Sequence, residues 1–185
     1  MTHMTGRIAF GEWRIEPRPP WMSGTDAKLR LAIAAFYDTE RLAGALREFV
    51  LFGLLPDNLW LLTDGGRDDA HADLRRALEG CGSLFARLPE NTLTAELIPG
   101  APLIFCTDTP VLHVLRQGIT ATGETCLEAL TQGEVGEEIK AHVRNGAIVA
   151  MAKADTPELQ DQCVRALLRY SLHTVHSEEC AYTTT

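Results

Sequence analysis

A strand–helix–strand pattern that occurs twice constrains the fold of this chain more than any other feature of its sequence. It covers residues 31–63 and, at nearly the same length, residues 147–176. Each copy has a short apolar run, then a helical stretch with apolar residues three and four positions apart, then a second short apolar run. Two such units can build one four-stranded antiparallel sheet with two helices on the same face.

Both copies carry clear signals for the start of their helix. Asp38 or Thr39 caps the first helix, and Thr156-Pro157 begins the second with a capping hydroxyl and a proline at the first helical position. The expected strands that open and close the pair are residues 31–37 and 172–176. The side chains predicted to be buried between helix and sheet are Leu42, Leu46, Phe49, Leu159, Cys163 and Leu167.

These units predict an α+β, ferredoxin-like domain over residues 29–180, after an extended arm at residues 1–28 and before a tail at residues 181–185. A mostly helical insertion, residues 64–146, separates the copies, with one short strand at residues 103–106. The second sheet face must also be covered, either by the insertion or by a second copy of the protein. A doubly wound α/β sheet fits less well, because the middle of the chain lacks strand signals.

The two copies also resemble a known family. The residues that carry the resemblance are Asp38-Thr39, Gly53, Pro56-Asp57 and Thr63 in the first copy, and Asn145-Gly146-Ala147 and Asp155-Thr156-Pro157-Glu158 in the second. In these two blocks the chain resembles the small bacterial general-stress-protein-like family. The resemblance implies a ferredoxin-like fold and a non-enzymatic, stress-associated role. Members often carry a Gly/Ala-rich hydrophobic segment between the halves, where this chain has a polar helical stretch.

The net charge bears on which partners the protein can bind, and the cysteines bear on the compartment in which it is found. The net charge is −8, and residues 31–185 alone carry −10, which argues against nucleic acid or an anionic membrane as a general partner. No apolar run approaches the roughly 18–20 residues of a membrane span. The five cysteines are an odd number without close pairs, which favours free thiols in a reducing cytoplasm.

His173, His176 and Cys180 are the candidate metal ligands, because imidazole and thiolate bind zinc and copper. If residues 172–176 form a strand, side chains three positions apart point to opposite faces, so the two histidines diverge. We therefore expect no metal site. No phosphate-binding glycine loop and no catalytic signature of the common kinds occurs, so we expect no cofactor and no catalytic residues.

The arm holds the candidate partner-binding residues, which are Trp13, Arg14, Pro17, Arg18 and Trp21. Tryptophan and arginine dominate binding hot spots, and proline lowers the entropy cost of ordering an extended segment. The arm either contacts another chain or folds back to cover its own sheet.

Three functions are consistent with these residues. The first is a non-enzymatic, stress-associated or assembly protein that acts through protein contacts, with self-association through the arm and the sheet face. The second is a regulatory domain that senses a small molecule. The third is an enzyme with a pocket between the sheet and the insertion. Only analogy of fold supports the second and the third.

Overall fold

The computed structural model describes residues 28–79, 81, 92–98, 101–106 and 134–181. The elements lie in the order β1 (Lys28–Phe36), α1 (Thr39–Leu51), η2 (Pro56–Asn58), β2 (Leu59–Asp64), α2 (Ala70–Glu79), β3 (Thr92–Ile98), β4 (Ala101–Cys106), α5 (Glu134–Arg144), β5 (Ile148–Ala154), α6 (Pro157–Tyr170) and β6 (Val175–Ala181).

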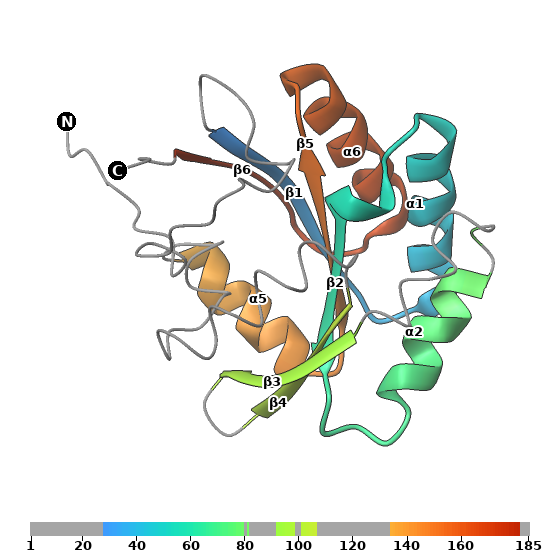
Figure 1. Ribbon diagram of the computed structural model, residues 1–185, viewed down its shortest axis with the longest axis vertical. Coiled ribbons are helices and arrows are strands. Elements are labelled where there is room, and N and C mark those ends of the chain that lie inside the picture. Colours follow the sequence, from blue (N-terminus) through green and yellow to red (C-terminus); the bar gives the residue numbers. More distant parts are fainter. Residues whose placement is uncertain (1–27, 80, 82–91, 99–100, 107–133, 182–185) are drawn as a thin grey trace, which may run out of the picture.

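The strands form one sheet in the order β3-β4-β2-β5-β1-β6, and every neighbouring pair is antiparallel (Figure 1). Because β5 lies between β1 and β2, and β1 lies between β5 and β6, the two strand–helix–strand units interlock. The predicted α+β class is confirmed, and both units do contribute to one antiparallel sheet. The sheet has six strands, not the predicted four, because the insertion adds β3 and β4. The strand predicted at residues 103–106 lies within β4, whereas β3 was not predicted from the sequence.

Local sequence sets where the main helices begin and end. The Asp38 carboxylate accepts a hydrogen bond from the Glu40 amide at 2.8 Å, and the Thr156 hydroxyl accepts one from the Leu159 amide at 3.1 Å. Gly53 follows α1 and Gly146 follows α5, both with positive φ (82° and 88°), a backbone conformation that glycine adopts without strain.

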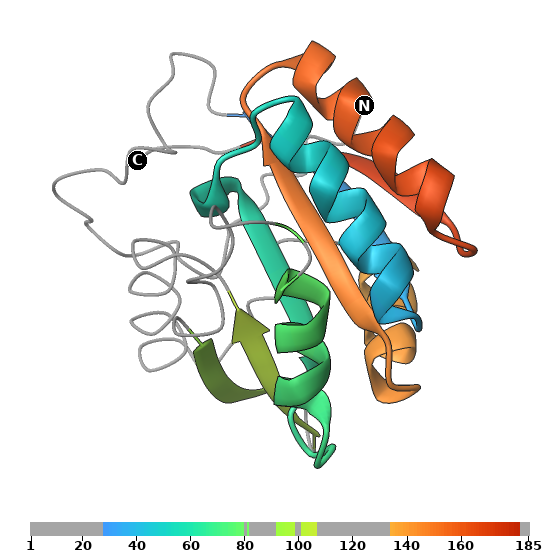
Figure 2. The same cartoon turned by 90° about the vertical axis from the view of Figure 1, so that its right-hand side faces the viewer.

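One face of the sheet is covered by α1, α2 and α6, and Figure 2 shows α1 and α6 side by side over it. Of the six side chains predicted to be buried, Leu42, Leu46, Phe49, Cys163 and Leu167 are buried, and Leu159 packs partly buried against the same core. Alternate residues of β1, β2 and β5 complete this core: Ala32, Ala34, Phe36, Leu59, Leu61, Ile148, Ala150 and Ala152.

The opposite face carries α5, which lies on the other side of the sheet from α1, α2 and α6 (Figure 1). Ile139 and Val143 of α5 are buried, as are the sheet residues whose side chains alternate with those of the first core: Leu31, Ile33, Trp60, Leu62, Val149 and Met151. The insertion therefore contributes cover to the second face, one of the two arrangements expected from the sequence.

The last strand differs from the sequence prediction. It was expected at residues 172–176, but β6 is Val175–Ala181. The helix before it ends at Tyr170, and the Ser171 hydroxyl then donates to the Ala35 carbonyl at 3.1 Å. This hydrogen bond holds the chain next to β1. The polar residues that follow then form β6 because they pair with the backbone of β1.

Candidate functional site

The predicted site residues fall in different parts of the molecule. The arm residues Trp13, Arg14, Pro17, Arg18 and Trp21 lie outside the described residues. Cys180 lies in β6, and its side chain is outside the described part. His173 lies in the connection between α6 and β6, and His176 lies within β6.

His176 reaches toward α5. It pairs with Ile33 in the β1–β6 ladder, so its side chain is on the sheet face that α5 covers. Its Nε2 lies 3.2 Å from a carboxylate oxygen of Glu138 on α5. The other oxygen of the same carboxylate is 3.6 Å from Nε2 of His142, one helical turn further along α5. Glu138 therefore stands between two imidazoles from different elements.

His142 connects this pair to the end of β1. Its Nδ1 is 2.9 Å from the hydroxyl oxygen of Tyr37, the residue after β1, and the hydroxyl donates this bond when Nδ1 carries no proton. The ring of His173 lies against both, with its centroid 4.9 Å from the Tyr37 ring and 5.1 Å from the His142 ring. We call these five residues, Tyr37, Glu138, His142, His173 and His176, the Tyr37 cluster.

The prediction that the side chains of His173 and His176 point to opposite sheet faces is wrong. Side chains three positions apart point to opposite faces only when both residues lie in one strand. Because β6 begins at Val175, His173 lies outside the strand and its side chain can point to the same side as that of His176. Both histidines lie next to α5 residues, His173 against His142 and His176 against Glu138.

The proximity of these histidines and Glu138 does not make them a metal site. Among the residues that the structure describes, no group of three or more His, Cys, Asp or Glu side chains is arranged to hold a metal ion. His142 already bonds Tyr37 through one ring nitrogen, and Glu138 lies beside His176. The cluster instead presents an aromatic side chain at the surface, where Tyr37 is 48% exposed.

The two cysteines whose side chains are described are unsuited to nucleophilic chemistry. Burial raises the pKa of Cys81 to about 11, which the nearby positive charge of Arg47 only partly opposes. Burial also raises the pKa of Cys163 to about 12. Because the thiolate is the reactive form, both side chains act as core residues near neutral pH.

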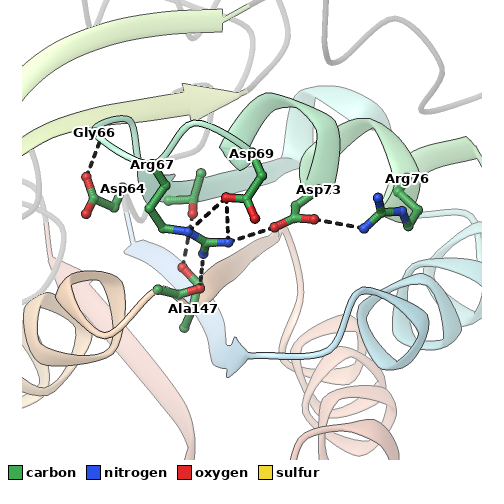
Figure 3. Close-up of polar contacts among 9 residues, drawn as sticks. Asp64, Gly66, Arg67, Asp69, Asp73, Arg76 and Ala147 are labelled. Carbon is green, nitrogen blue, oxygen red and sulfur yellow. Dashed lines mark hydrogen bonds and ion pairs between the residues drawn. The ribbon is translucent and has the colours of Figure 1, made fainter.

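A second polar cluster surrounds Arg67 and has a structural role (Figure 3). The guanidinium of Arg67 donates to the Gly146 carbonyl, to Asp69 at 3.0 Å and to Asp73 at 2.7 Å. It ties the start of α2 to the turn before β5. These contacts of Arg67 all lie within the chain and hold α2 against the turn before β5, so we do not assign the cluster as a binding site.

Three of the five cluster residues, Tyr37, Glu138 and His142, were not candidates from the sequence. A local signal existed for two of them, since Glu138 and His142 are four positions apart on a helix and so share one face. The proximity of Tyr37 had no local signal, because 105 residues separate it from His142.

Comparison with family models, with curated proteins and with solved structures finds no match for this chain. The resemblance to the general-stress-protein-like family therefore stays a prediction. Within the described ranges, no helix is both long enough and apolar enough to span a membrane.

Proposed function

We propose that this protein is a non-enzymatic interaction protein, with a stress-associated or assembly role in the cytoplasm, that binds another protein through the Tyr37 cluster. The observation that carries the proposal is the state of Tyr37 itself: its side chain is half-exposed, yet it is held by two neighbours. Tyrosine is among the residues most enriched in binding hot spots.

The geometry of the cluster lowers the cost of binding at this residue. The hydrogen bond to His142 fixes the hydroxyl, and the His173 ring packs against the tyrosine ring at a centroid distance of 4.9 Å. A side chain that is already ordered loses less conformational entropy when a partner covers it. Leu172, which precedes His173 in the chain, is also exposed.

Site-specific photo-crosslinking in cells tests this proposal. A photoreactive phenylalanine analogue replaces Tyr37 in one tagged variant and Leu51 in a control variant. Leu51 is 84% exposed and lies at the end of α1, outside the cluster. We expect a discrete protein adduct from position 37 that position 51 does not give.

The protein in that adduct is then purified and its affinity measured. Tyr37→Ala should weaken binding by roughly tenfold or more, the effect typical of a hot-spot residue, whereas Leu51→Ala should leave it unchanged. Identical adducts from both positions, or an affinity within about twofold of the unmodified chain for Tyr37→Ala, would refute the proposal.

A further inference from the structure

The β6 strand forms one edge of the sheet. In the described part of the chain it pairs only with β1. An edge strand presents a row of backbone N–H and C=O groups that can pair with another strand. Its sequence contains no proline, and its residues 175–179 are at least partly exposed.

Helix α6 lies beside this edge and exposes an apolar residue there. The Gln160 amide nitrogen donates to the Leu31 carbonyl at 3.1 Å and to the Glu178 carbonyl at 3.2 Å, so this side of the helix lies over β1 and β6. Arg169 instead bonds Glu48 of α1, on the other side. By helical periodicity Asp161, Val164 and Leu168 lie on the side away from α1. Leu168 is 60% exposed there, and Val164 is partly buried.

The side chains along this edge are self-complementary. His176 and Glu178 are two positions apart in β6 and share a face. If a second β6 pairs antiparallel about Ser177, each His176 stands opposite the Glu178 of the other copy. A register centred on Glu178 would instead place two carboxylates opposite each other, which is unfavourable.

The position of α6 independently places the two-fold axis near Ser177. Gln160 is level with Glu178, since they are hydrogen-bonded. One strand residue advances about 3.3 Å and one helical residue about 1.5 Å, so Ser177 is level with roughly residue 162 of α6. A two-fold axis near this level brings Asp161 of one copy toward Arg165 of the other, in both directions. Both side chains are exposed.

From this agreement we propose that a second copy of the chain binds at this edge, through antiparallel pairing of β6 about Ser177 and contact between the two α6 helices. The interface is isologous, so each complementary pair occurs twice. The two sheets join into one across the two-fold axis, and each copy covers Leu168 of the other. This surface shares His176 with the Tyr37 cluster but does not include Tyr37 itself. A chain that stays monomeric would therefore leave the crosslink expected from position 37, and with it the proposed function, standing.

Sedimentation of the full chain over a range of concentrations tests the proposal. We expect a dimer for the unmodified protein, and at least a tenfold rise in its dissociation constant for Leu168→Glu, since a charge would be buried at the interface. Leu51→Glu is the matched control, an equally drastic change at an exposed leucine away from the edge, and it should stay dimeric. A monomer at all concentrations, or equal loss in both variants, would overturn the proposal.

Charge reversal identifies the register. Asp161→Arg and Arg165→Asp should each weaken self-association, because each places like charges opposite each other. Mixed in equal amounts, the two variants should recover a mixed dimer, since every facing pair is then opposite in sign. Thermal melts confirm that each variant folds. Folded variants that dimerise unchanged alone, or that do not recover on mixing, would refute the Asp161–Arg165 contact and with it the Ser177-centred arrangement.

Discussion

Helices α1 and α6 approach each other closely at Gly44. Whether alanine at this position raises or lowers the free energy of unfolding therefore depends on the packing between the two helices. A β-carbon added at Gly44 would lie 2.4 and 2.5 Å from two ring carbons of Tyr170, far inside van der Waals contact. The Tyr170 side chain is partly buried against the core, so it cannot move away freely. Glycine here allows the two helices to pack.

Two effects of Gly44→Ala oppose each other. Alanine in place of glycine within a helix stabilises by about 1 kcal/mol, whereas forcing an extra carbon into a packed interface costs about 1–3 kcal/mol. We therefore expect Gly44→Ala to lower the free energy of unfolding by up to about 2 kcal/mol, the overpacking cost less the gain in helix propensity. Urea denaturation followed by circular dichroism measures the change.

Removing the ring should reverse the sign. In a Tyr170→Ala background the added carbon meets no ring, and Gly44→Ala should raise the free energy of unfolding by about 1 kcal/mol. The hydrogen bond from Arg41 to the backbone carbonyl of residue 170 is independent of the substituted side chain, which keeps this background comparable. Equal stabilisation by Gly44→Ala in both backgrounds would show that the helices are not in contact at this position.

Two further predictions concern the core. Leu46 is fully buried between α1 and the sheet, so Leu46→Ala should lower the free energy of unfolding by about 2–5 kcal/mol in the same urea assay, and a change below about half a kcal/mol would contradict this packing. The pKa of Cys163 is raised by burial from 9.0 to about 12, so the folded state retains a proton that the unfolded state loses, and stability should fall as the pH rises from about 9 toward 12. Cys163→Ala should flatten this alkaline decline in melts recorded across that range, and an identical slope in both proteins would argue against the burial of this thiol.

The sequence by itself determined the two strand–helix–strand units, because their signals are local. The cap at Asp38, the Thr156-Pro157 start and the apolar stripe of each helix depend on residues within one or two turns. These signals specify which side of each helix is buried. That was enough to predict the α+β class and one antiparallel sheet for both units.

The bounds of β6 and the composition of the Tyr37 cluster were decided only by the tertiary structure. The residues of β6 are mostly polar, so no apolar alternation marks them, and the strand forms where β1 offers hydrogen-bonding groups. The cluster joins the end of β1, the middle of α5 and the start of β6, which meet only after α5 packs on the second sheet face. Local patterns specify which residues turn inward, but contacts between segments a hundred residues apart depend on how the layers pack against one another.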